Sequence, residues 1–221
     1  MPQVNIFRWR SGGGWLVVSG GGAVLSEDVQ SIEARVLVRT HSQGPIAYIW
    51  AAGSIDDADA HMDSLQEMGA RTGYLVDILT EEDDVLFRQI NEAGVIILGG
   101  GPNVDVLADA LSGVVLNAMQ EAFGRGATIY AVGDSAGVLA SYDVRGTMIH
   151  PGIGWIEGAL VMPGYSADQA ESLRDMVHRH PEAYGLGLSA GAAMAFGPQG
   201  EIEVWGNQQV TVSLGHPGSS V

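Results

Sequence analysis

Short apolar runs alternate with amphipathic stretches along the first two thirds of the chain. Continuous apolar runs are typical of strands buried on both faces of a parallel sheet, and apolar residues at every third or fourth position are typical of the helices that cover it. The runs that predict strands are 15–19, 46–50, 74–76, 95–98 and 127–132. The pattern therefore predicts an α/β fold, a doubly wound and mostly parallel sheet flanked by helices.

Several amphipathic stretches carry boundary signals for helices. Ser26 comes directly before two acidic residues, and Ser54 stands before a stretch that Gly69 can end. Serine is a preferred residue at the N-cap of a helix, and glycine is preferred just beyond the last turn. Apolar residues at helical spacing also predict one long helix that begins near Leu107 and ends near Gly124.

After about Ser141 the chain becomes rich in Gly and Pro. A helix is predicted over residues 168–180. The short strands expected after it are 192–196, 202–205 and 210–212. Since no linker and no repeat divides the chain, we expect a single α/β domain over residues 1–221, with irregular ends at 1–12 and 215–221.

Composition narrows the range of functions. The formal net charge is −16, from 26 acidic and 10 basic residues, and a field of this sign repels phosphate backbones, so no nucleic acid partner is expected. The absence of a long apolar run and of a signal-peptide pattern leads us to expect a cytoplasmic protein without membrane contact. The chain contains neither Lys nor Cys, which excludes Schiff-base chemistry, thiol nucleophiles and cysteine metal sites.

The segment Gly133-Asp134-Ser135-Ala136-Gly137 fits the pattern G-x-S-x-G. In that motif a serine occupies a sharp and strained turn between a strand and a helix, and the helix points its free N–H groups at the serine. Ser135 is therefore a candidate nucleophile, and the N–H group of Ala136 is a candidate oxyanion donor. The same pattern occurs around Ser189, but a short strand and a turn follow there, which favours a structural role.

A run of three glycines follows the strand predicted over 95–98. Glycines allow backbone N–H groups to approach a substrate closely, so Gly100 and Gly101 are candidates for the second half of an oxyanion hole. The alternative is an ordinary tight turn. Neither this run nor the glycines at 20–22 fit G-x-G-x-x-G, and the histidines lack the spacing of a metal site, so we expect no cofactor and no metal.

Taken in order, these features resemble the cyanophycinase and dipeptidase E family of serine peptidases, whose fold is flavodoxin-like and related to class I glutamine amidotransferases. The matching segments are 20–22, 51–54, 99–103, 133–137, 180–182, 185–188 and 206–212. The resemblance implies hydrolysis of small peptides. The residues that it assigns are Ser135 as nucleophile, Gly100, Gly101 and Ala136 as oxyanion hole, and Pro102, Asn103 and Asp134 as ligand contacts.

The chain departs from the family pattern at both partners of the serine. Gly164 stands where the family carries the catalytic histidine, and Ser189 and Ala190 stand where it carries the acid. Because a serine without a base is a weak nucleophile, three alternatives stay open: a slow hydrolase, a hydrolase with a relocated base, or a non-catalytic pseudoenzyme that binds a ligand or regulates. His150 is the best candidate for a relocated base.

In each of these cases we expect the partner to be a small peptide or an amino-acid-like ligand. A homo-oligomer is compatible with a domain of this kind, although the sequence points to no interface.

Overall fold

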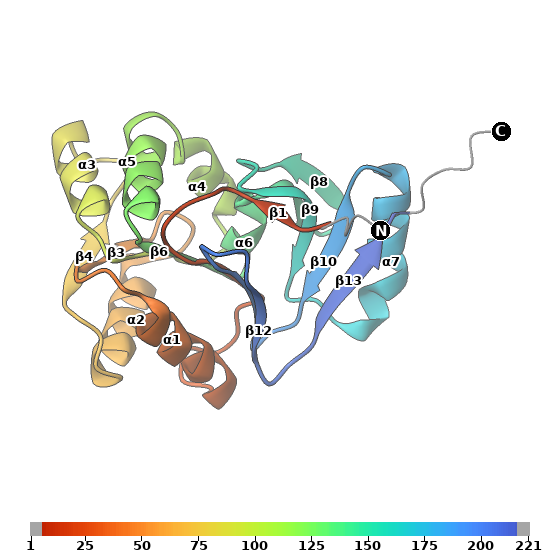
Figure 1. Ribbon diagram of the computed structural model, residues 1–221, viewed down its shortest axis with the longest axis horizontal. Helices are drawn as coiled ribbons and strands as arrows, with labels where there is room; N and C mark the ends of the chain where they lie inside the picture. The colour runs from red at the N-terminus through yellow and green to blue at the C-terminus, as the bar shows by residue number, and fades with distance from the viewer. Residues whose placement is uncertain (1–5, 216–221) are drawn as a thin grey trace.

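The computed structural model describes residues 6–215, which form two β-sheets and the helices that cover them (Figure 1). The larger sheet has seven strands in the order β12-β11-β2-β6-β5-β3-β4. Their bounds are β2 Leu16–Ser19, β3 Ile46–Ile49, β4 Gly73–Val76, β5 Val95–Leu98, β6 Thr128–Val132, β11 Ala192–Phe196 and β12 Ile202–Gly206.

Five of these strands run parallel to one another, namely β2, β6, β5, β3 and β4. At one edge β11 pairs antiparallel with β2, and β12 pairs antiparallel with β11. Every residue of β2, β3 and β5 is buried, as the continuous apolar runs predict for strands that are covered on both faces. The doubly wound, mostly parallel sheet is thereby confirmed.

Helices cover both faces of the larger sheet (Figure 1). The bounds are α1 Glu27–Arg39 and α2 Ile55–Glu67 on one face, and α3 Asp83–Asn91, α4 Val104–Ala110 and α5 Gly113–Gly124 on the other. Ser26 caps α1 by accepting the N–H of Val29 at 3.4 Å, and Ser54 caps α2 by accepting the N–H of Asp57 at 3.1 Å. Both predicted starts are thus confirmed.

The long helix predicted from Leu107 to Gly124 is wrong in one respect, because it is two helices. The first ends at Ala110, and Leu111 has φ −74° and ψ 61°, outside the helical region. Gly113 then begins the second helix with φ +52°, a left-handed conformation that glycine adopts without a steric penalty. Apolar spacing continues across the break, so the periodicity alone does not show it.

The second sheet is built mostly from the region after Ser141. Its strand order is β13-β10-β9-β7-β8, and β1 pairs with the start of β9. The bounds are β1 Arg8–Trp9, β7 Ala140–Arg145, β8 Met148–Pro151, β9 Ile156–Pro163, β10 Tyr184–Leu188 and β13 Val210–Leu214. One turn of helix, α6 (Ser135–Val138), leads from the larger sheet into β7.

Besides β1, four of these strands, β7 to β10, are absent from the sequence prediction, because glycines interrupt the apolar pattern. Gly146, with φ +61°, lies in the turn between β7 and β8. Gly158, with φ +68°, lies within β9, whose pairing with β7 shifts register between Ala140 and Tyr142. A bulge of this kind uses glycine to bend the strand, so a glycine that looks like a loop residue lies inside a sheet.

The ends of the chain differ in part from the prediction. Arg8–Trp9 forms β1 although residues 1–12 were expected to be irregular, and the pairing with β9 fixes this short segment to the second sheet. Gly215 has no regular structure, whereas residues 1–5 and 216–221 lie outside the described part of the chain. Within residues 6–215, no helix is long and apolar enough to cross a membrane.

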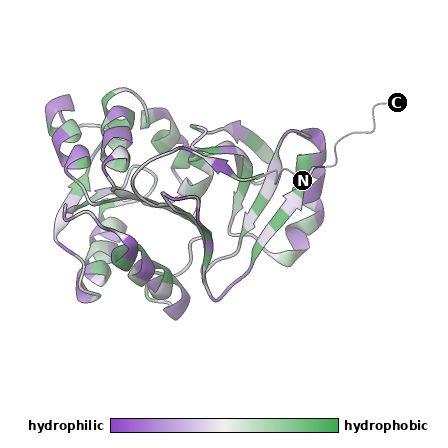
Figure 2. Ribbon diagram, viewed as in Figure 1, coloured by the Kyte–Doolittle hydropathy of each residue, from purple (hydrophilic) through white to green (hydrophobic). Residues whose placement is uncertain are grey.

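The core has three parts. One lies between the larger sheet and helices α1 and α2, and another lies between that sheet, helices α3 to α5 and the second sheet. A third packs α7 (Ala170–Arg179), which follows the 3-10 turn η1 (Ala167–Gln169), on the second sheet. The helices carry both hydrophilic and hydrophobic residues (Figure 2), as expected for elements with one face in the core and one in water.

Candidate functional site

Ser135 lies where β6 leaves the larger sheet. Gly133, with φ +57°, makes the sharp turn after β6, and Asp134 precedes the first residue of α6 in a right-handed helical conformation. Within residues 6–215, no residue other than glycine has a positive φ. The expectation of strained torsions at the serine is therefore wrong, because the glycine two positions earlier makes the turn instead. The helix that follows spans only four residues, so its dipole is short.

The hydroxyl group of Ser135 donates a hydrogen bond to the backbone. The residue is fully buried, and its Oγ donates a hydrogen bond of 2.6 Å to the carbonyl oxygen of Gly99, at the end of β5. Among the described residues, no histidine, aspartate or glutamate side chain forms a hydrogen bond with this hydroxyl. A serine needs a base within hydrogen-bond reach to become a strong nucleophile, and this arrangement does not supply one.

The candidate oxyanion donors divide into two groups. The N–H of Ala136 donates to the carbonyl oxygen of Gly133 at 2.9 Å, so an internal acceptor already occupies it. The N–H groups of Gly100 and Gly101 have no acceptor among the hydrogen bonds of residues 6–215. A Cβ atom on Gly100 would lie 2.6 Å from the carbonyl oxygen of Val132, and one on Gly101 would lie 2.2 Å from that of Ala52. Only glycine fits at these two positions.

A cavity of about 500 Å³ lies at the carboxyl ends of β2, β5 and β6, and we call it the glycine cavity. Open α/β sheets bind ligands at this edge. Its lining residues are Gly20, Gly21, Gly22, Ala23, Val24, Tyr48, Asp57, His61, Gly100, Gly101, Val132, Gly133, Asp134 and Gly164. The cavity brings together three candidates from the sequence, Gly100, Gly101 and Asp134, with Gly164, where the sequence resemblance leads us to expect a histidine.

A second cavity of about 340 Å³ shares Gly101 and Asp134 with the first and also includes Pro102 and Arg145. Asn103 is exposed, and its backbone N–H donates to the carbonyl oxygen of Ala52 at 2.8 Å. It lines neither of these two cavities. Two of the three residues expected to contact a ligand thus lie on cavity walls, and their contact with a ligand stays a prediction.

His150 lies in β8, where it pairs with Asp143 of β7 in the antiparallel ladder. Asp143 is buried, and burial raises its pKa although the neighbouring Arg145 and His150 oppose that rise. Arg145 Nε donates to Asp143 Oδ2 at 2.6 Å. Within residues 6–215, no hydrogen bond joins His150 to Ser135, so its role as a relocated base stays a prediction without a contact that carries it.

Ser189 lies in the turn between β10 and β11. Its carbonyl oxygen accepts the N–H of Ala192 at 3.0 Å, and Gly191, with φ +77°, completes the turn. No helix follows this serine, which agrees with the structural role favoured from its flanking residues. The second G-x-S-x-G pattern therefore connects the two sheets.

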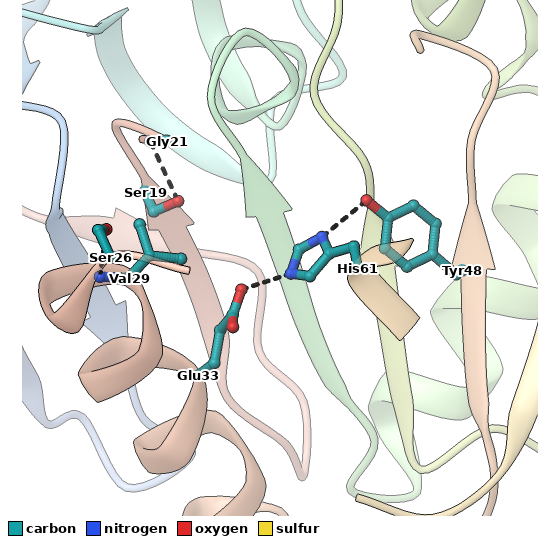
Figure 3. A network of polar contacts seen from close by, with 7 residues as sticks. All are labelled: Ser19, Gly21, Ser26, Val29, Glu33, Tyr48 and His61. Atoms are coloured by element: carbon teal, nitrogen blue, oxygen red, sulfur yellow. Dashed lines mark hydrogen bonds and ion pairs between the residues drawn. The ribbon is translucent and has the colours of Figure 1, made fainter. Parts of the chain in front are cut away.

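One set of polar residues, in the glycine cavity and behind it, does not stand out in the sequence. Glu33 of α1, His61 of α2 and Tyr48 of β3 form a chain of contacts within the core (Figure 3). A signal for two of them was present, because each interrupts an apolar helix face. Glu33 stands four residues after Val29, and His61 stands next to Met62 on the buried side of α2.

Comparison with known proteins finds a family with a similar sequence and solved structures with a similar fold. The model of peptidase family S51 matches residues 15–149. A crystal structure of a peptidase from an acI-B1 Actinobacterium has a TM-score of 0.74 and 18% sequence identity and covers 94% of both chains. A putative peptidase E protein from Listeria monocytogenes EGD-e has a TM-score of 0.60 and 13% identity, covering 88% of this chain and 99% of that one. No curated protein matches the sequence.

Proposed function

Because this chain belongs to peptidase family S51, we propose that it uses the peptidase fold to bind a small peptide or an amino-acid-like ligand in the glycine cavity. We propose further that it does so without a serine, histidine and acid triad. The observation that carries this second statement is the Ser135 hydroxyl, which is fully buried and donates to the carbonyl oxygen of Gly99. The residue at the position of the family's histidine, Gly164, has no side chain.

The lining of the glycine cavity supports a ligand of this class. Gly100 and Gly101 offer backbone N–H groups that suit a carbonyl or carboxylate oxygen. Asp57 and Asp134 offer carboxylates that suit an amino group. Peptides and amino acids carry both kinds of group within a few bonds of each other. The combination favours them over ligands that are purely anionic or purely apolar.

Binding is tested by titrating a panel of dipeptides into the protein in a calorimeter. We expect saturable heat with some members of the panel and about tenfold weaker binding to the Asp134→Asn variant, because one charged hydrogen bond is lost. Asp109→Asn is the matched control, since Asp109 is exposed on α4 and lies outside the glycine cavity. A panel without any binding would contradict the proposed function.

A slow serine hydrolase is the second candidate, and the unpaired N–H groups of Gly100 and Gly101 favour it. In this case the Ser135 hydroxyl would have to leave Gly99, and an oxyanion hole alone supports only about 10³–10⁴-fold acceleration over water. A fluorophosphonate probe separates the candidates. We expect no labelling of Ser135 if the chain only binds its ligand. Labelling that Ser135→Ala abolishes would favour the hydrolase.

A further inference from the structure

Three polar side chains from separate elements meet in the core (Figure 3), and two of them line the glycine cavity. His61 Nε2 lies 2.5 Å from Glu33 Oε1, and His61 Nδ1 lies 2.9 Å from Tyr48 Oη. The side chains of Glu33, His61 and Tyr48 are almost completely buried, with exposures of 0%, 3% and 5%. They form a carboxylate, imidazole and hydroxyl series, and its last two members line the cavity.

Burying these three polar side chains in the core costs free energy. A buried carboxylate loses its hydration, and apolar side chains of similar volume are often as stable or more stable. Glu33 Oε2 has no hydrogen-bond partner among the described residues, so even the carboxylate is only half satisfied. The imidazole of His61 is the partner of the other oxygen. A contribution to stability does not by itself explain this series, whose last two members line the cavity.

The direction of each hydrogen bond depends on the tautomer of His61. An ionised Glu33 can only accept, which places the hydrogen between Glu33 and His61 on Nε2. With a neutral imidazole, Nδ1 then has a lone pair and accepts the hydroxyl hydrogen of Tyr48. The phenol oxygen of Tyr48 is left with lone pairs alone, so it can only accept hydrogen bonds from a ligand in the cavity.

The charges around Tyr48 also favour a ligand group that donates hydrogen bonds. Burial and the nearby carboxylates of Glu33 and Asp57 raise the pKa of Tyr48, so the phenol keeps its hydrogen. No arginine lines the glycine cavity, and the chain contains no lysine. A cationic ligand group would therefore bring the positive charge that the walls of this cavity lack.

We propose that Tyr48, held by His61 and Glu33, is the binding site for a primary ammonium group of the ligand. The ammonium donates one hydrogen bond to Tyr48 Oη, and the cavity carboxylates of Asp57 and Asp134 balance its charge. This inference rests on the proposed binding of a ligand in the glycine cavity and adds the chemical group that is recognised there. It requires no bond to form or break.

Calorimetry with matched dipeptides tests the inference. Alanyl-alanine and its C-terminal amide should bind, whereas N-acetyl-alanyl-alanine, which lacks the ammonium, should bind about 10–100-fold more weakly. Tyr48→Phe should weaken binding of alanyl-alanine to a similar extent. Tyr184→Phe is the matched control, because Tyr184 is also a buried tyrosine but lies in the second sheet with a hydroxyl that has no partner among the described residues.

The possible results distinguish the ammonium site from the proposed binding of a ligand in the glycine cavity. Equal binding of the acetylated dipeptide, or unchanged binding by Tyr48→Phe, would overturn the ammonium site and leave ligand binding intact. A lack of binding by all three dipeptides would overturn both. A second test needs no ligand: nitrogen NMR of the histidines should show His61 neutral with hydrogen on Nε2. An imidazolium, or hydrogen on Nδ1 alone, would overturn the ammonium site.

Discussion

Two hydroxyl groups approach Gly99 in different surroundings. The Ser135 hydroxyl donates to its carbonyl oxygen, and the ring of Tyr48 packs where its side chain would be. Ser135 lies within a G-x-S-x-G pattern, and no histidine among residues 6–215 forms a hydrogen bond with it. Tyr48 has no motif around it, yet an imidazole and a carboxylate stand in line behind its hydroxyl. The residue types of a relay are therefore assembled at the hydroxyl that the motif does not mark.

Ser135 and Tyr48 differ in how far apart in the chain the residues lie that form each arrangement. The motif around Ser135 is a local property, because it describes how five consecutive residues turn from a strand into a helix. The partners of a nucleophile are not local, because they come from other segments of the chain. The series behind Tyr48 joins α1, β3 and α2. The turn at Ser135 and the polar series behind Tyr48 are therefore specified by different parts of the chain.

The largest effect is expected from His61→Ala, which removes the only described partner of the Glu33 carboxylate. Loss of the imidazole leaves the buried carboxylate without its hydrogen-bond donor, so the free energy of unfolding should fall by about 3 kcal/mol. Urea denaturation followed by circular dichroism measures it. Ser64→Ala is the control on the same helix, because Ser64 is buried and its hydroxyl has no partner among the described residues.

The double variant Glu33→Leu with His61→Leu sharpens this result. It removes both polar groups at once, so it should recover most of the stability that His61→Ala loses, to within about 1 kcal/mol of the natural chain. A double variant as unstable as the single one would mean that packing, and not an unpaired charge, explains the loss. The polar contact between Glu33 and His61 would then no longer distinguish the surroundings of Tyr48 from those of Ser135.

The next effect is expected from Gly99→Ala, which acts on the residue that both hydroxyls approach. A Cβ atom there would lie 2.6 Å from Tyr48 Cε1 and 2.9 Å from its Oη. The ring has to move, and overpacking of this kind should lower the free energy of unfolding by about 2–3 kcal/mol. Gly124→Ala is the control, because a Cβ atom on Gly124 meets nothing within 4 Å. Equal stability of the two variants would show that the ring yields freely.

A smaller effect is expected from Ser135→Ala. The variant leaves the carbonyl oxygen of Gly99 without the hydroxyl that donates to it, which should cost about 1–2 kcal/mol in urea denaturation. Binding of dipeptides to the glycine cavity should not change, since Ser135 is not among its lining residues. If the natural chain hydrolyses a dipeptide and the variant does not, Ser135 is a nucleophile and the comparison with Tyr48 is reversed.

Much of the fold could be predicted because its determinants are local. The continuous runs at β2, β3 and β5 mark strands buried on both faces, and Ser26 and Ser54 mark helix starts through their own hydrogen bonds. The second sheet could not be predicted in the same way. Its strands contain glycines such as Gly158 that a bulge requires, and these break the alternation that marks a strand.

The candidate site was predictable only in its backbone. Gly100, Gly101 and Asp134 were identified from their places after strands, and the structure brings them to one cavity. Contacts between side chains depend on which helices face each other, and a single sequence does not give this. Glu33 and His61 are 28 residues apart, and only their shared face of the larger sheet puts them in contact. The sequence offered one signal for this contact, because Glu33 and His61 each interrupt an apolar helix face.

The smallest effect is expected from Gly164→His, which places an imidazole where the sequence resemblance leads us to expect the family's base. Gly164 has φ +62°, and a Cβ atom there would meet nothing within 4 Å, so the cost should be about 1 kcal/mol, from the left-handed backbone alone. We expect no labelling of Ser135 by a fluorophosphonate probe in this variant. The hydroxyl would still be buried and bonded to Gly99, and a base in the cavity cannot take a hydrogen that points at a carbonyl. Labelling that appears in Gly164→His and disappears in Gly164→His with Ser135→Ala would show that the missing imidazole is the whole difference between the two hydroxyls, and that the buried orientation of Ser135 is a consequence of losing it.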